Sequence, residues 1–221
     1  ILSQTKDSLN YLLSQTKSKT LTIFIHGFNY PNPSADYNLL RKNIEQITNL
    51  DLVYLEVFWD GLTANQGSPP TSKIWSYAQF NSSQIAVTLR RIVNEINPKY
   101  KIRIITHSLG ASVGTGLLFN TTSKWKNPES LGKYSDMIKN ISAPKNNDIR
   151  IGMLAPAIPG QSTFIDFNNR TASKHKKQKN TINKIVVGHN CNDYAVTKRF
   201  LGLDFLTSKA GSTTLGANYK G

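Results

Sequence analysis

The chain has 221 residues, with 27 Lys and Arg against 13 Asp and Glu, and a formal net charge of +14 at pH 7. This length can bury a substantial core and predicts a single domain over residues 1–221. No stretch approaches the roughly 20 consecutive apolar residues that a transmembrane helix needs, so none is expected. The single cysteine, Cys191, excludes an intramolecular disulfide framework.

The positive charge does not by itself indicate a nucleic-acid partner. It concentrates only in RTASKHKKQKN, Arg170–Asn180, which lacks the aromatic side chains that stack on bases. We therefore expect a solvated basic exterior and no nucleic-acid binding. The four histidines and one cysteine show no familiar zinc-ligand spacing, so neither a metal nor a cofactor is expected.

Strand and helix patterns alternate along the chain. β-Branched apolar runs predict strands, and apolar residues at helical spacing predict helices. In chain order, the expected elements are a strand over 20–28, a helix over 35–47, a strand over 51–60, a helix over 78–96, a strand over 101–106, a helix over 108–119, strands over 148–155 and 182–188, and a helix over 193–206. This order is typical of an α/β domain with a mainly parallel sheet and helices on both faces. Ligands of such sheets bind beyond the carboxyl ends of the strands.

The segment THSLG, Thr106–Gly110, lies where a strand should turn directly into a helix. A serine at such a turn has its hydroxyl pushed out above the sheet, and small residues are needed two positions before and after it, as in the pattern G-x-S-x-G. Ser108 fits the nucleophile position, although Thr106 replaces the first glycine. The N–H of Leu109, at the helix start, would face a developing oxyanion. The alternative is an ordinary serine N-cap.

A second motif follows the first predicted strand. IFIHGFNY places His26 and Gly27 where the chain leaves the sheet, and a glycine there allows the loop to approach a substrate. The N–H of Phe28 is then the natural second oxyanion donor. We expect His26 to be a structural residue that holds this loop, not a catalytic base.

Together, TIFIHGFNY (Thr22–Tyr30) and RIITHSLGA (Arg103–Ala111) resemble the α/β-hydrolase superfamily, and more narrowly its poorly characterised serine hydrolases related to lipases and esterases. The resemblance covers roughly residues 21–206. It implies an eight-stranded sheet and a triad in the chain order serine, acid, histidine. This chain offers only the central strands of such a sheet, so we expect a domain that lacks its last strand and is incomplete at the C-terminus.

Two loops after the nucleophile can be compared with the family's acid positions. In the first, Ala155 of LAPA stands where one lipase branch carries an aspartate, so this position is not expected to supply the acid. In the second, Asp193 lies just before a predicted helix, where the superfamily usually holds its acid. An N-cap role for Asp193 is compatible with this prediction. Asp166 is a weaker candidate.

No histidine follows Asp193, although the resemblance places the base there. Three explanations are open. The base belongs to a segment beyond Gly221 that this chain lacks; or His189, four residues before Asp193, supplies it in an altered arrangement; or the protein is a catalytically impaired hydrolase-fold module that binds without cleaving.

The sequence therefore predicts a serine hydrolase that cleaves carboxylic esters, small-molecule or lipid, through an acyl-enzyme on Ser108. Trp59, Trp75 and Tyr77 could line an apolar acyl pocket or could simply belong to the core. Because no targeting signal is visible, a cytoplasmic location is expected, although an N-terminus missing before Ile1 would hide one.

Overall fold

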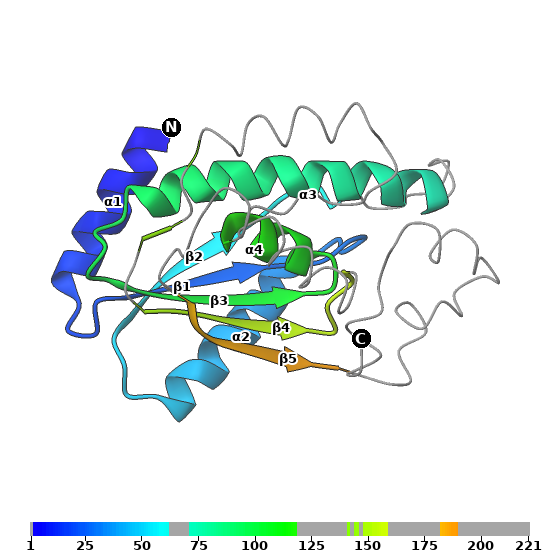
Figure 1. Ribbon diagram of the computed structural model, residues 1–221. Helices are drawn as coiled ribbons and strands as arrows, with labels where there is room; N and C mark the ends of the chain where they lie inside the picture. Colours follow the sequence, from blue (N-terminus) through cyan, green and yellow to red (C-terminus); the bar gives the residue numbers. More distant parts are fainter. Residues whose placement is uncertain are drawn as a thin grey trace.

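In the computed structural model, the described residues are 2–61, 71–118, 141, 144–145, 148–158 and 182–189. Within them, five strands form one all-parallel sheet in the order β2-β1-β3-β4-β5 (Figure 1). The strands are β1 (Thr20–Ile25), β2 (Leu52–Val57), β3 (Lys101–His107), β4 (Ile149–Leu154) and β5 (Ile182–Gly188). The predicted α/β class with a parallel sheet is confirmed.

The described helices cover both faces of this sheet (Figure 1). They are α1 (Leu2–Gln15), α2 (Pro33–Ile47), α3 (Thr71–Asn94) and α4 (Gly110–Leu118). Figure 1 shows α3 and α4 on one face and α2 on the other. No helix in the described ranges is long and apolar enough to cross a membrane.

Each face of the sheet is packed by side chains of one parity along the strands. Gly114 of α4 lies against Ile104, Thr106 and Ile151, which sit on the α3/α4 face. On the opposite face, Phe24 stacks on Tyr37 of α2, with ring centroids 5.7 Å apart. β1 is buried along its whole length because it lies inside the sheet with helices on both sides.

One helix lies where none was predicted, and another begins well before its predicted start. α1 was not expected, because its sequence is polar and, of its side chains from Gln4 onward, only Leu9 and Leu13 are buried in the core. α3 begins at Thr71 and not at Ala78. The helix starts directly after Pro69 and Pro70 in the sequence, and proline is compatible with the beginning of a helix but not with its interior.

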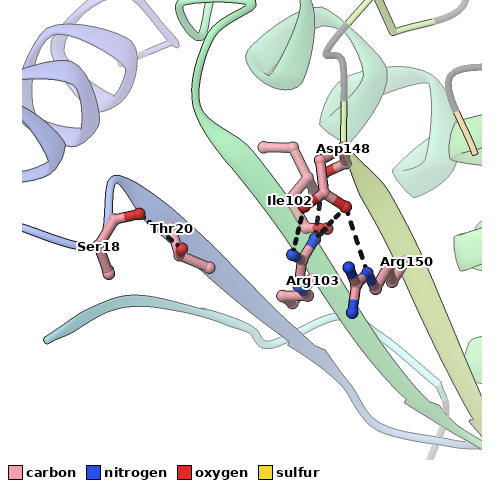
Figure 2. A network of polar contacts seen from close by, with 6 residues as sticks. All are labelled: Ser18, Thr20, Ile102, Arg103, Asp148 and Arg150. Carbon is pink, nitrogen blue, oxygen red and sulfur yellow. Dashed lines mark hydrogen bonds and ion pairs between the residues drawn. The ribbon is translucent and has the colours of Figure 1, made fainter. Parts of the chain in front are cut away.

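The amino ends of β3 and β4 carry a charged cluster (Figure 2). Arg103 binds both carboxylate oxygens of Asp148, at 2.7 and 3.0 Å. Arg150, which is paired with Arg103 in the sheet register, donates to the same carboxylate at 3.3 Å. Asp148 therefore separates two like charges on neighbouring strands.

Candidate active site

Ser108 occupies a strained turn between β3 and α4. Its φ is +50°, in the left-handed region that non-glycine residues rarely adopt. Three backbone hydrogen bonds hold the turn: the Ser108 N–H donates to the Leu154 carbonyl at 3.0 Å, and the Ser108 carbonyl accepts from Ala111 at 3.1 Å and from Ala157 at 3.0 Å. The end of β4 thus fixes the conformation in which the serine stands between strand and helix.

Glycines allow three backbones to meet at this turn. A Cβ on Gly27 would lie 2.7 Å from the Cβ of Ser108. A Cβ on Gly110 would lie 2.5 and 2.6 Å from the carbonyl oxygens of His26 and Ile25. All three distances are shorter than real Cβ contacts, so neither position can carry a side chain without displacing a neighbour. The loop after β1 is therefore pressed against the serine and the first turn of α4.

The threonine that replaces the usual first glycine is accommodated from the opposite side. Thr106 is buried, and a Cβ on Gly114 would lie only 2.8 Å from its Cγ2. Gly114, one turn into α4, therefore leaves the space that the Thr106 methyl occupies. The only sign of this packing in the sequence is a second glycine, Gly114, four residues after Gly110.

His26 is fixed at every polar atom. Its ring Nε2 accepts the backbone N–H of Trp59 at 3.2 Å, so the ring proton resides on Nδ1, which donates to the Gly27 carbonyl at 2.8 Å. Its backbone N–H donates to the Tyr37 hydroxyl at 2.7 Å, and that hydroxyl donates to the Val57 carbonyl. Burial lowers the pKa of His26, so the ring is neutral. These contacts agree with the structural role predicted for His26.

Trp59 lies in the core beside His26. It is 7% exposed, its ring stacks on the imidazole with centroids 5.6 Å apart, and its indole N–H donates to the His26 carbonyl at 2.9 Å. These are contacts of the core alternative, and a role in substrate binding stays a prediction. Trp75 and Tyr77 belong to α3, and their side chains lie outside the described residues.

The two predicted oxyanion donors each adjoin a residue of this turn in the sequence. Leu109 directly follows the serine, and its side chain is fully buried beneath the start of α4. Phe28 follows Gly27 in the turn after β1 and is half-buried against the core. The N-terminal end of α4 carries partial positive charge at this place, which favours a developing anion.

The predicted acid residues, Asp193 and Asp166, lie outside the described residues. His189 follows β5 directly and is exposed. Since β4 separates β3 from β5, the backbones after these two strands are about 10 Å apart at the same edge of the sheet. The assignment of base and acid to His189 and Asp193 stays a prediction.

Ala155, which follows the end of β4, has a structural role. Its φ is +42°, and its N–H donates to the Gly188 carbonyl at 2.7 Å, which ties the end of β4 to the end of β5. Among the described residues, no group of three or more His, Cys, Asp or Glu side chains could hold a metal ion.

No known family model matches the chain, and no curated protein matches it. A solved structure described as an iodinated complex of acetyl xylan esterase is similar to the chain, with a TM-score of 0.40 and 13% sequence identity over 86% of this chain and 94% of that one. A likeness of this extent does not bear on activity, which has to be argued from the contacts of this chain.

Proposed function

We propose that the protein is a serine hydrolase of the α/β-hydrolase type that cleaves carboxylic esters, with Ser108 as the nucleophile. The observation that carries the proposal is the left-handed φ of Ser108 at the strand-to-helix turn, pressed against Gly27. Such a conformation costs about 1–3 kcal/mol, and strain of this kind clusters at functional sites. An ordinary N-cap serine needs no such conformation.

In the proposed reaction, the Ser108 hydroxyl attacks the ester carbonyl carbon while a base accepts its proton. The carbonyl oxygen becomes an oxyanion, which the N–H groups of Leu109 and Phe28 stabilise by hydrogen bonds. Collapse of this intermediate breaks the bond to the alcohol, which leaves with the proton. Water then releases the acid from the acyl-enzyme by the same steps.

His26 is not the base, because both its ring nitrogens are engaged and its pKa is lowered by burial. His189 is the candidate base within the chain, with Asp193 as the acid that orients it, and a base beyond Gly221 is the alternative. The variant His189→Ala separates them. If His189 is the base, kcat falls by about 10³-fold or more, whereas retained activity places the base elsewhere.

Hydrolysis of p-nitrophenyl acetate by the intact protein tests the proposal. Wild type should turn over the ester, and Ser108→Ala should reduce kcat to background. The matched control is Ser112→Ala, which removes the hydroxyl one turn further along α4 that bonds the Ser82 hydroxyl at 2.9 Å. This control should retain activity. A wild type no faster than Ser108→Ala contradicts the proposal and favours the hydrolase-fold binding module.

A further inference from the structure

The loops that follow β1 and β2 are joined by a set of polar and packing contacts beside Ser108. Trp59, after β2, donates its backbone N–H to the His26 ring and its indole N–H to the His26 carbonyl. Two residues later, the Gly61 carbonyl accepts the N–H of Asn29 at 3.2 Å. The loop after β2 therefore holds both sides of the segment His26–Asn29, which contains the proposed oxyanion donor.

The Gly27–Phe28 peptide lies at the centre of these contacts. Its carbonyl oxygen accepts the Nδ1–H of His26 at 2.8 Å. The same oxygen packs so closely on Gly61 that a Cβ there would lie 2.7 Å away. No peptide bond in the described residues is cis, and in a trans peptide the N–H points opposite to the C=O. Fixing the Gly27 carbonyl therefore also fixes the direction of the Phe28 N–H.

The tautomer of His26 decides whether this peptide can be held. Because the Trp59 N–H occupies Nε2, the ring proton stays on Nδ1 and faces the Gly27 carbonyl. With the proton on Nε2 instead, an unshared pair on Nδ1 would face the carbonyl oxygen and repel it. In a flipped Gly27–Phe28 peptide, the Gly27 carbonyl would point where the Phe28 N–H points now, and no donor would face the oxyanion.

We propose that His26 and Trp59 are positioning residues that lock the Gly27–Phe28 peptide against flipping, so that the Phe28 N–H stays aimed at the oxyanion. The inference rests on the proposed serine hydrolase function. Neither side chain touches the reacting atoms. The Trp59 backbone N–H sets the tautomer of His26, His26 holds the Gly27 carbonyl, and Gly61, which has no Cβ, leaves the space that this carbonyl oxygen occupies.

Two substitutions of His26 separate the roles of its two ring nitrogens, because each keeps the hydrogen bond of one nitrogen and loses that of the other. In His26→Asn, the side-chain NH₂ takes the place of Nδ1–H and still donates to the Gly27 carbonyl. In His26→Gln, the amide reaches the place of Nε2 and the Nδ1 donor is lost. With p-nitrophenyl acetate, we expect His26→Gln to lower kcat by about 100-fold, the size of a lost oxyanion donor, with KM within about two-fold. His26→Asn should retain kcat within about five-fold.

Trp59→Phe keeps the backbone N–H that sets the tautomer but removes the indole N–H that holds the His26 carbonyl, and so supplies a second, milder test. We expect a several-fold lower kcat with KM unchanged, whereas Phe58→Leu, the exposed neighbour, should match wild type. Thermal unfolding of each variant shows which are folded, and if neither His26 variant folds, Trp59→Phe decides alone.

Equal loss of kcat in the folded His26→Asn and His26→Gln variants overturns the positioning role, and so does an unaltered kcat in Trp59→Phe. In either case, turnover by the wild type still supports the proposed function. A wild type no faster than Ser108→Ala overturns both.

Discussion

The two ends of the sheet are built in opposite ways. At the carboxyl ends, backbones touch through glycines, Ser108 and Ala155 have positive φ, and a neutral histidine is buried. At the amino ends, partly exposed side chains of Arg103, Arg150 and Asp148 form ion pairs on ordinary strands. Of the four non-glycine residues with positive φ in the described ranges, Asn29, Ser108 and Ala155 follow strands at the carboxyl ends, whereas Lys19 precedes β1 at the amino end. The carboxyl ends are where parallel sheets bind ligands.

This difference between the two ends of the sheet distinguishes the candidate active site at the carboxyl ends from a charged surface at the amino ends. The Asp148 cluster is the more conspicuous polar network (Figure 2), yet its carboxylate is already shared by two guanidinium groups. Surface ion pairs contribute about 0–1 kcal/mol, and the bidentate, partly exposed Arg103–Asp148 pair belongs at the upper end of that range. A Cβ on Gly27 or Gly110 would lie within 2.7 Å of the Ser108 Cβ or of two backbone oxygens, so substitutions there should have far larger effects.

The largest expected effect is that of Gly110→Ala. The added Cβ would lie 2.5 and 2.6 Å from two backbone oxygens, and neither can shift without moving β1. We expect the free energy of unfolding to fall by about 3 kcal/mol or more, at or above the upper end for overpacking. Urea unfolding measures this. A loss below about 1 kcal/mol contradicts the close packing of α4 on the end of β1.

Gly27→Ala should affect activity more than stability. Its Cβ would meet the Ser108 Cβ at 2.7 Å and so displace either the nucleophile or the oxyanion loop. We expect kcat toward p-nitrophenyl acetate to fall by about 100-fold. The control is Gly152→Ala in β4, where the nearest atom to a Cβ is 4.0 Å away and activity should be retained. Similar kcat values for the two variants would mean that close packing at this turn matters no more for activity than packing in β4.

The buried His26 should make stability depend on pH. Its folded-state pKa lies below the ordinary value of 6.5, so below about pH 6.5 the unfolded chain binds a proton that the native protein does not. The free energy of unfolding should therefore fall as the pH is lowered through 6.5, by up to about 1.4 kcal/mol per pH unit, until the folded pKa is reached. His26→Asn should show a flatter profile over pH 7.5 to 5 in urea unfolding. Parallel profiles for the two proteins would show that His26 is not buried in its neutral form.

The smallest effect is expected at the other end of the sheet. Asp148→Asn removes the charge that the two arginines share, and the loss in unfolding free energy should stay within about 1 kcal/mol. In 1 M NaCl the difference from wild type should shrink, since salt screens exposed charges. Esterase activity should not change. A lower kcat in this variant would show that the charged cluster at the amino ends of the sheet affects the candidate active site at the other end.

Local sequence patterns predicted the turn at Thr106–Gly110 and the loop at His26–Phe28, because each demands small residues at fixed positions. The strands were also predictable, since β-branched runs such as Thr20–Ile25 are buried on both faces. The polar helix α1 was not, because Leu9 and Leu13 are too few to show helical spacing without their tertiary partners.

The coupling of Trp59 to His26 could not be predicted either. It depends on the adjacency of β1 and β2 and on the hydrogen bonds of backbone groups, which carry no sequence signal. The room that Gly114 leaves for Thr106 is similar, because it requires the angle at which α4 crosses β3 and β4. In each case the missing information was the identity of the tertiary neighbour.

The nucleophilic serine can be tested most directly by mass spectrometry of the intact protein after treatment with a fluorophosphonate. One adduct per molecule should form, and peptide mapping should place it on Ser108. Ser108→Ala should remain unmodified, while Ser112→Ala should be labelled like wild type. An adduct on another residue, or equal labelling of Ser108→Ala, would contradict the assignment of Ser108 as the nucleophile.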